Sequence, residues 1–446
     1  GGTVNVADAD VSGVTSFTAN SEVVITPTQL EQLLDTQDNF SISSDSAEQS
    51  SFTLDIRDDA DVAAYNRLVN EGGLIVEGDG ASTFTFVASV TESTFDGDVT
   101  AATEAAAAQL SALIKGQTFT LTTSADSGAD FTGGENVDTY TAVDTTLTAD
   151  DNLDGGASRD EVDLTYSLSG AESVSGFNLN NIERFNITLN DEDSSAGDTG
   201  TVNFLQSDGV DLIKVGGATD AANPDTVALT NVELGTDLEA RGDKVKLDAT
   251  YRASEITGGD DSANVAVNGV QSTSTSNGTV TIGSGIETVN LDAIGNASTL
   301  GDLDVNGAAV TLTGYADLTI SGTSNLVSIA GSDYTGSLDL TTAGQAVTSI
   351  ETGSGADKID ADSTVDVSIS TNAGADEIDL TTNAVAGDNI TVDAGAGNDT
   401  ITTADQINNG DDSVDGGADN DTILMSKTAF ANAAAQVTNV ETFDLQ

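Results

Sequence analysis

Short alternating stretches of apolar and polar residues dominate the chain from residue 117 onward. Residues 279–282 (Thr-Val-Thr-Ile) and 309–313 (Ala-Val-Thr-Leu-Thr) are clear examples, and turn-forming residues separate such stretches from one another. A period of two places alternate side chains on opposite faces of a β-strand. The pattern therefore predicts many short strands over residues 117–446, each with one apolar face.

Residues 1–116 follow a mixed pattern. Leu30, Leu33 and Leu34 have helical spacing, and they follow Thr26 and Pro27, which suit the N-cap and the first helical position. Because helix-like and strand-like segments alternate here, we expect a small N-terminal α+β domain that caps the β-region or is inserted in it. The further elements expected are helices at about 58–70 and 101–115 and strands at 52–56, 74–77 and 83–90.

Six turns in the chain end in an aspartate that is followed two residues later by isoleucine, valine or tyrosine. The copies at 416–423 (Gly-Gly-Ala-Asp-Asn-Asp-Thr-Ile) and 394–401 (Ala-Gly-Ala-Gly-Asn-Asp-Thr-Ile) come closest to the nonapeptide of calcium-binding β-rolls. The less complete copies occupy 133–140, 155–162, 353–359 and 372–378. The aspartates at 138 and 160 are 22 residues apart, and those at 357, 376, 399 and 421 are separated by 19, 23 and 22. This near-constant step predicts one solenoid coil per repeat.

The residue types of these turns suit a hard cation. Calcium takes roughly six to eight oxygen ligands in flexible geometry, aspartate supplies a charged oxygen, and glycines let the backbone turn sharply and point carbonyls inward. A single turn gives only part of a coordination sphere, so a neighbouring coil must complete it. Metal binding should therefore be coupled to the stacking of coils and to folding. The apolar residue two positions after the aspartate should fill the interior of the coil.

A second signature reads Asn or Gly, Ile or Val, Glu, two variable residues, Asn or Asp, and Leu or Ile. It occurs at 181–187, 285–291 and 439–445, with a partial copy at 350–352. Glu183 lies 23 residues after Asp160, and Glu441 lies 20 residues after Asp421, which is again one coil. The glutamates Glu183, Glu287 and Glu441 could bind metal or order the end of a strand, and the sequence leaves both alternatives open.

The combination of glycine-aspartate turns and glutamate-bearing strands resembles the calcium-binding bacterial surface-layer (S-layer) proteins of the repeats-in-toxin (RTX) group. In that family such turns alternate with N-V-E-T-x-N-L strands in a β-helical lattice domain. The resemblance covers residues 117–446 and implies a parallel β-solenoid with bound Ca²⁺ at an extracellular address. It also implies that turn aspartates bind calcium through carboxylates and turn glycines through backbone carbonyls. The ligand set expected on this basis is Asp138, Asp154, Asp160, Gly353, Gly355, Asp357, Gly374, Asp376, Asp393, Gly395, Gly397, Asp399, Asp415, Gly417, Asp419 and Asp421.

Composition narrows the function classes. The chain carries 74 Asp and Glu against 12 Lys and Arg, a formal net charge of −62, which argues against duplex nucleic acid and anionic membrane surfaces as partners. It has no Cys and no His, which removes disulfides, zinc–thiolate sites and His-dependent triads. No apolar run reaches the ~18 residues of a membrane span. Self-repulsion at this charge opposes folding unless cations neutralise it, and the favoured cation is calcium at the turns. Adaptation of the surface to a saline medium is the alternative.

Acidic residues also cluster outside the glycine turns. For these we expect solvated loop charge; they are Asp360, Asp362, Asp411, Asp412 and residues 191–193. The middle of the chain, about residues 190–340, has few good nonapeptides and is expected to be solenoid without metal.

These observations predict a secreted structural protein and not an enzyme, because the sequence contains no P-loop, dinucleotide fingerprint or nucleophile elbow. We expect calcium-dependent self-assembly into a surface layer, sheet or filament at the bacterial cell surface. The expected partner is the chain itself, with cell-surface polysaccharide as a further candidate, and the resemblance implies type I secretion. The alternatives left open are an RTX adhesin or ice-binding solenoid, and the calcium-folded secretion module of an exported enzyme.

Overall fold

The computed structural model describes most of residues 117–446 and short segments before them. The ranges left out after residue 117 are 135–136, 169–170, 192–197, 218–224, 244, 272–277, 343, 382–388, 408–409 and 434–435. The segments described before residue 117 are 4–5, 16–18, 23–25, 29, 41–43, 51–56, 85–90.

The first compact unit comprises Gly1–Thr118 together with Gly133–Thr139 and Gly155–Asp160. It contains a parallel four-stranded sheet in the order β1-β3-β5-β6 and a parallel pair of β2 with β4. These strands are β1 (Val4–Asn5), β2 (Ser16–Thr18), β3 (Val23–Ile25), β4 (Ser41–Ser43), β5 (Ser51–Ile56) and β6 (Thr85–Val90). Strands β5 and β6 agree with the strands expected at 52–56 and 83–90.

The other elements expected in the N-terminal domain lie outside the described residues. These are the helices at 58–70 and 101–115 and the strand at 74–77. Of the helix expected after Pro27, only Gln29 is described, and it is helical.

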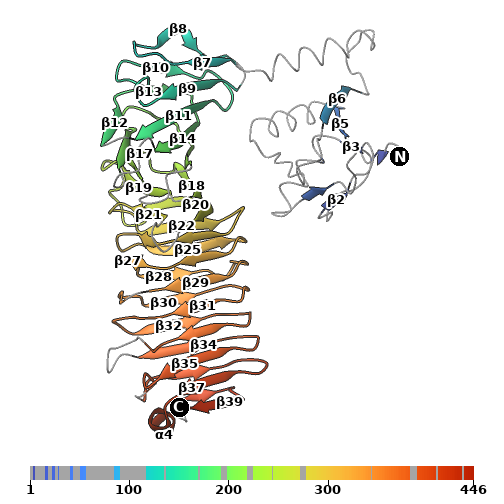
Figure 1. Ribbon diagram of the computed structural model, residues 1–446, viewed down its shortest axis with the longest axis vertical. Helices are drawn as coiled ribbons and strands as arrows, with labels where there is room; N and C mark the ends of the chain where they lie inside the picture. The colour runs from blue at the N-terminus through green and yellow to red at the C-terminus, as the bar shows by residue number, and fades with distance from the viewer. Residues whose placement is uncertain are drawn as a thin grey trace. The chain divides into compact units, whose positions relative to one another are not determined.

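The second compact unit is a parallel β-solenoid, as the sequence predicted (Figure 1). One sheet of 15 strands runs along the whole stack, and sheets of 3, 7 and 8 strands form the other sides. The 15-stranded sheet consists of β7 (Thr118–Thr120), β9 (Thr139–Val143), β11 (Glu161–Leu168), β14 (Arg184–Asp191), β16 (Leu212–Gly216), β18 (Asp237–Asp243), β20 (Ser262–Gln271), β22 (Thr288–Ala293), β25 (Ala309–Gly314), β28 (Ser328–Ala330), β30 (Ser349–Glu351), β32 (Val367–Ser370), β34 (Ile390–Asp393), β36 (Ser413–Asp415) and β38 (Val437–Thr438).

The remaining sheets change along the solenoid. The three-stranded sheet belongs to the first coils and consists of β8 (Ser127–Thr132), β10 (Asn152–Asp154) and β13 (Asn178–Asn180). The seven-stranded sheet belongs to the middle coils and consists of β12 (Glu172–Ser175), β15 (Thr199–Asn203), β17 (Thr226–Val232), β19 (Lys246–Tyr251), β21 (Thr279–Ile282), β24 (Asp302–Asp304) and β27 (Thr323–Ser324). The eight-stranded sheet belongs to the last coils and consists of β23 (Ser298–Leu300), β26 (Leu318–Ile320), β29 (Leu338–Thr341), β31 (Lys358–Asp360), β33 (Glu377–Asp379), β35 (Thr400–Ala404), β37 (Thr422–Met425) and β39 (Thr442–Leu445). From β28 on, the chain alternates between the 15-stranded and the eight-stranded sheet.

The core of the solenoid is built from columns of apolar side chains that stack from coil to coil. Ile359, Ile378, Ile401 and Ile423 each follow a motif aspartate by two residues, and each is 0% exposed. They pair in register from coil to coil, so that identical side chains stack on one another. Burial of such a side chain contributes about 1.5–3 kcal/mol. The expectation that this position fills the interior is confirmed.

Helix is scarce in the part of the solenoid that the structure describes. Helix α4 (Lys427–Ala433) lies between β37 and β38 at the C-terminal end (Figure 1). Its Phe430 ring packs edge-on against Phe443 of β39 at a centroid distance of 5.2 Å. Among the described residues, no helix is both long and apolar enough to cross a membrane.

Candidate cation-binding turns

The repeated aspartates of the last coils each stand immediately before a strand of the eight-stranded sheet. Asp357 precedes β31, Asp376 precedes β33, Asp399 precedes β35 and Asp421 precedes β37. Because these strands pair in register, the four aspartates form a column with one member per coil. Each is at most 2% exposed. A carboxylate buried to this extent requires hydrogen-bond donors or a counter-charge.

The column is joined by hydrogen bonds from backbone to carboxylate. The Asp357 N–H donates to Asp376 Oδ1 and the Asp376 N–H donates to Asp399 Oδ1, both over 2.8 Å. The Asp399 N–H donates to Asp421 Oδ1 over 2.9 Å, and the Asp421 N–H donates to Glu441 Oε2 over 2.8 Å. We call these five residues the carboxylate ladder. A hydrogen bond to a charged acceptor contributes about 1.5–3 kcal/mol, so the ladder binds successive coils together.

The ladder unites the two signatures of the sequence. Glu441 comes from the strand signature, yet it occupies the rung that follows Asp421. Glu287 acts in the same way in the middle coils, where its Oε2 accepts the Asp261 N–H over 2.9 Å. Glu287 and Glu441 therefore each order the backbone just before a strand, and the possibility that they also bind metal stays a prediction.

The second carboxylate oxygen of the ladder aspartates is the unusual feature. In the part of the chain that the structure describes, Oδ2 of Asp357, Asp376, Asp399 and Asp421 is buried and has no hydrogen-bond partner. Buried polar atoms are almost always partnered, because an unpartnered one loses its hydration without compensation. Each of these oxygens could therefore bind a proton or coordinate a cation.

The same burial raises the pKa values of the four ladder aspartates. Loss of hydration raises the pKa of Asp376 and of Asp399 to about 6, although each accepts a backbone hydrogen bond, and the Thr371 hydroxyl near Asp376 also works in the opposite direction. Burial also raises the pKa of Asp357 and Asp421. The neighbouring aspartate charges add to the effect, since like charges disfavour ionisation. The ladder thus disfavours its own ionised form unless a positive charge is near.

Glycines bring backbone carbonyls to these carboxylates. A Cβ added at Gly416 would overlap the Asn439 carbonyl oxygen and would lie 2.9 Å from Asp421 Oδ2. Likewise, a Cβ at Gly374 would overlap the Gly355 carbonyl oxygen and lie 2.6 Å from Asp376 Oδ1. At these two glycines, carboxylate and carbonyl oxygens from adjacent coils therefore surround a small space that a Cβ would fill. We call such a space a glycine cradle. Gly416 was not among the residues expected at the site, although it opens the clearest repeat.

Other glycines of the last turns also lie against the backbone of a neighbouring coil. Gly397 has φ +137° and Gly395 has φ +93°, a region that other residues rarely adopt. A Cβ at Gly397 would overlap the Gly374 carbonyl oxygen, and one at Gly417 would overlap that of Gly395. At Gly353 the overlap would be with the Tyr334 carbonyl oxygen. The expected glycine positions are thus places where the backbones of successive coils touch.

The turn at Asp138 satisfies its aspartate differently. Asp138 Oδ1 accepts the Gln117 N–H, and Asp138 Oδ2 accepts the Gly134 N–H over 2.6 Å. The Asp138 N–H in turn donates to Asp160 Oδ1 over 2.6 Å. Both aspartates are buried, at 1% and 0% exposure. Because backbone donors occupy both oxygens of Asp138, this turn has less need of a cation than the last coils.

The other expected ligands lie outside the ladder. Asp393 and Asp419 are exposed, and Asp154 and Asp415 are half-buried. Asp393 and Asp415 are neighbours in register on β34 and β36. The Asp415 carboxylate accepts the Gly417 N–H over 3.1 Å, which orders the turn itself. These side chains are more exposed than the ladder aspartates, although the charges of Asp419 and Asp415 help to raise the pKa of Asp421.

Several buried carboxylates were missed from the sequence. Asp412 was expected to be solvated loop charge, but it is 2% exposed and its Oδ1 accepts the Ile390 N–H over 3.0 Å. Asp151 and Asp225 make equivalent bonds, to the Asp126 N–H and the Asp198 N–H, both over 2.8 Å. All three aspartates stand two residues before a buried apolar residue, and none requires a glycine nearby, so this spacing is the signal that could have identified them. The apolar residues are Val414, Leu153 and Val227.

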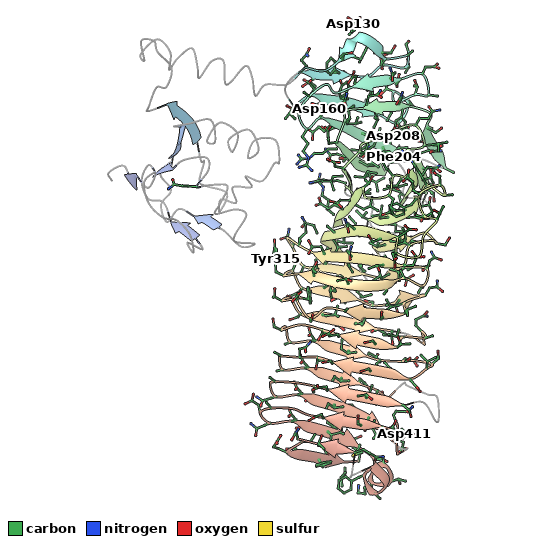
Figure 2. The ribbon with its side chains drawn as sticks, turned by 180° about the vertical axis from the view of Figure 1, so that it is seen from behind. Asp130, Asp160, Phe204, Asp208, Tyr315 and Asp411 are labelled. Atoms are coloured by element: carbon green, nitrogen blue, oxygen red, sulfur yellow. The ribbon has the colours of Figure 1, made fainter. Side chains whose placement is uncertain are left out.

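The remaining acidic clusters divide between surface and strand. Asp130, Asp208 and Asp411 are exposed on the outside of the solenoid (Figure 2). Asp411 therefore agrees with the expected solvated charge. Asp360 and Asp362 are half-buried, and Asp360 belongs to β31, so the expectation of a loop was wrong for it. The side chains of residues 191–193 lie outside those described.

The donor set of the last coils fits a hard cation. No group of three or more acidic side chains that could hold a metal occurs among the described residues. A cation would instead combine one buried carboxylate oxygen per turn with backbone carbonyls from adjacent coils. Oxygen-only ligands in irregular geometry are what calcium accepts, whereas magnesium requires near-ideal octahedral geometry.

Comparison with known proteins gives no further guide. The chain matches no protein-family model, no curated protein and no solved structure.

Replacement of Gly397 tests the cradle geometry. Gly397→Ala should destabilise the protein by about 1–3 kcal/mol, because φ +137° is unfavourable for alanine and its Cβ would overlap the Gly374 carbonyl. The measurement is thermal unfolding followed by circular dichroism in excess calcium. Gly410→Ala is the matched control, since a Cβ there meets no atom within 4 Å. Equal effects of the two substitutions would contradict the close packing described here.

The raised pKa values predict a pH dependence in chelator. Asp376 and Asp399 have a pKa of about 6 when folded, above the ordinary value of 3.8, so the folded protein binds more protons between these values. The stability that these groups contribute is therefore present at low pH and is lost as pH rises through about 6. The melting temperature should fall between about pH 4 and pH 6, and it should fall less in the double variant Asp376→Asn, Asp399→Asn. An identical slope in both proteins would refute the assignment.

Proposed function

We propose that this chain is a secreted, calcium-dependent structural protein that assembles with copies of itself into a surface layer, sheet or filament on a bacterial cell. The observation that carries the proposal is the column of buried Oδ2 atoms of Asp357, Asp376, Asp399 and Asp421, which have no hydrogen-bond partner among the described residues. A calcium ion at each turn would neutralise these oxygens. The proposed role is structural and includes no catalytic step.

The chemistry of the turns explains why calcium would act on folding. At Gly416 the candidate site draws oxygens from two adjacent coils, namely Asp421 Oδ2 and the Asn439 carbonyl. Such a site does not exist in an unfolded chain, so the free energy of metal binding becomes free energy of folding. Extracellular calcium would then couple folding to export, since the ladder carries uncompensated charge until the ion is available.

Net charge supports the assembly part of the proposal. A formal charge of −62 makes copies of the chain repel one another at low ionic strength. Exposed carboxylates such as those of Asp393 and Asp411 line the outside of the last coils, where divalent cations could bridge neighbouring molecules. Because repulsion between copies opposes assembly and bridging cations favour it, assembly would require calcium.

One observation disfavours an ice-binding solenoid. Such a protein needs threonines stacked in a regular array over many coils, yet Thr311 pairs in register with Asn290 on one side and Ala330 on the other. The in-register stack of Thr400, Thr422 and Thr442 is confined to the last coils. The oligomeric state of the folded protein distinguishes the remaining functions, because a surface layer assembles with copies of itself, whereas we expect an adhesin or a secretion module to stay monomeric.

The proposal predicts that folding and assembly respond to calcium together. Calcium is titrated into chelator-treated protein while circular dichroism reports β-structure and light scattering reports size, with magnesium as the control ion. We expect both signals to rise with calcium and not with magnesium. A rise in β-structure alone, with the protein monomeric, would favour an adhesin or a secretion module. A chain that is fully folded in chelator and indifferent to calcium would contradict the metal assignment.

A matched pair of variants sharpens the titration. Asp399→Asn keeps an acceptor for the Asp376 N–H but removes the charge at a buried rung, so the calcium response should weaken and shift to higher concentration. Asp411→Asn removes the same charge from an exposed position and should leave the response of β-structure unchanged.

A further inference from the structure

Arg252 lies at a corner of the middle coils where the sequence has no glycine-aspartate turn. It directly follows β19, whose neighbours in the seven-stranded sheet are β17 and β21, with β15 beyond β17. Its side chain is only 10% exposed. A buried guanidinium is unusual and requires partners for its charge and its donors.

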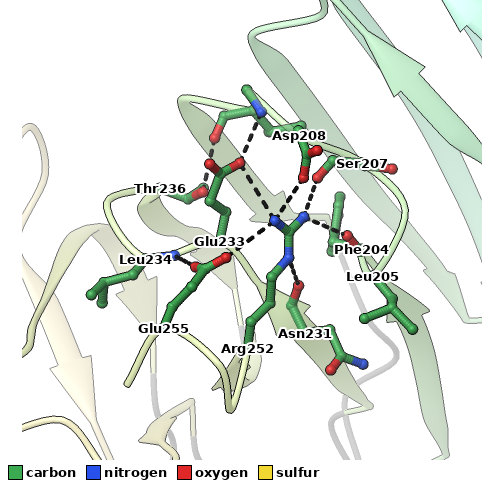
Figure 3. Close-up of polar contacts among 12 residues, drawn as sticks. Phe204, Leu205, Ser207, Asp208, Asn231, Glu233, Leu234, Thr236, Arg252 and Glu255 are labelled. Carbon is green, nitrogen blue, oxygen red and sulfur yellow. Dashed lines mark hydrogen bonds and ion pairs between the residues drawn. The ribbon is translucent and has the colours of Figure 1, made fainter. Parts of the chain in front are cut away.

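Backbone carbonyls of the two preceding coils surround the guanidinium (Figure 3). Nη2 donates to the Phe204 carbonyl over 2.9 Å and also to the Ser207 carbonyl, both just after β15. Nε donates to the Asn231 carbonyl, in β17, over 3.2 Å. One side chain therefore ties together the turns of three consecutive coils.

Carboxylates complete the environment. Nη1 donates to Asp208 Oδ1 over 2.7 Å and to Glu255 Oε1 over 3.3 Å, and it lies 3.9 Å from Glu233 Oε2. The two glutamates are themselves rungs between coils, since Glu233 Oε2 accepts the Gly209 N–H over 2.8 Å and Glu255 Oε2 accepts the Leu234 N–H over 2.6 Å. Without a positive charge, three carboxylates would face one another at this corner.

The set of atoms around the guanidinium resembles the ligand set of a hard cation. It consists of the carbonyl oxygens of Phe204, Ser207 and Asn231 and the carboxylates of Asp208, Glu233 and Glu255. We propose that Arg252 is a built-in cation that holds the coils of residues 199–256 together without any bound metal. This block is then the calcium-independent core of the solenoid.

The contrast with the last coils rests on the proposed function, whereas the role of Arg252 does not. Guanidinium keeps its charge at all accessible pH values and cannot dissociate from the chain. The coils that it joins should therefore remain paired in chelator, while coils that depend on a free ion open. Folding of the last coils on calcium addition would then begin from a block that is already ordered.

The test is hydrogen exchange with mass spectrometry on the full chain, in chelator and in calcium. In wild-type protein, amides of β17 and β19 should be protected in chelator and change little with calcium, whereas amides of β33, β35 and β37 should gain protection. Arg252→Met retains most of the apolar stem but removes the charge and the donors. It should lower the protection of β17 and β19 in chelator by about a hundredfold or more, because three backbone carbonyls lose their hydrogen-bond donor and the partly exposed carboxylates lose a nearby positive charge.

Lys358→Met is the matched control. Its side chain is 52% exposed and lies 4.0 Å from its partner carboxylate on Glu377, so it should leave the protection of β17 and β19 unchanged. Arg252→Lys keeps the charge but not the planar fork and should fall between wild type and Arg252→Met. If Arg252→Met does not fold at all, Asp208→Asn removes a single carboxylate and should lower the same protection more mildly.

Two results would overturn the inference. One is full protection of β17 and β19 in the folded Arg252→Met protein, which would mean that the guanidinium only fills space. The other is a calcium response of wild-type β17 and β19 as large as that of β37. Failure of the proposed function is distinguishable, because it would appear as no calcium response in β33, β35 and β37 with the Arg252→Met effect intact.

Discussion

In a stack of parallel coils, the backbone N–H group just before a strand points along the solenoid axis and must find an acceptor on the next coil. Here a carboxylate supplies that acceptor, as the bond from the Asp376 N–H to Asp399 Oδ1 illustrates. The constraint explains why an acidic residue recurs from coil to coil just before a strand, and the residue two positions after each ladder aspartate is buried. It also explains why aspartate and glutamate signatures alternate: Glu441 and Asp421 are rungs of one ladder.

The same solution creates a charge problem, because a rung uses one carboxylate oxygen and buries the other. Three arrangements compensate the buried carboxylate charge along the chain. At Asp138 a second backbone N–H group occupies the other oxygen. At the middle corner Arg252 brings a fixed positive charge to Glu233 and Glu255. In the last coils neither device is present among the described residues, and in the proposal a mobile cation would take their place, with carbonyl oxygens at the glycines as further ligands. Dependence on calcium would thus be a property of particular coils and not of the whole solenoid.

The periodic part of this architecture could be predicted from the sequence, and the rest could not for identifiable reasons. Alternation with period two and the interior position of Ile359 or Ile423 follow from local pattern, so the solenoid was expected correctly. Asp412 was expected to be solvated because no glycine turn surrounds it. The capping position, however, requires only an aspartate two residues before a buried apolar residue, here Val414. The Arg252 cluster joins residues up to 48 positions apart, and no local pattern marks it. The role of Glu287 was open because metal binding and backbone capping require the same carboxylate.

The central claim is that a cation completes the carboxylate ladder of the last coils. It is tested most directly by anomalous scattering measured on the calcium-soaked crystalline protein at a wavelength where calcium contributes strongly. The account predicts anomalous peaks at about 2.3–2.6 Å from Oδ2 of Asp357, Asp376, Asp399 and Asp421, with backbone carbonyls as the other ligands. Peaks confined to exposed acidic side chains, with the ladder oxygens bare, would contradict it.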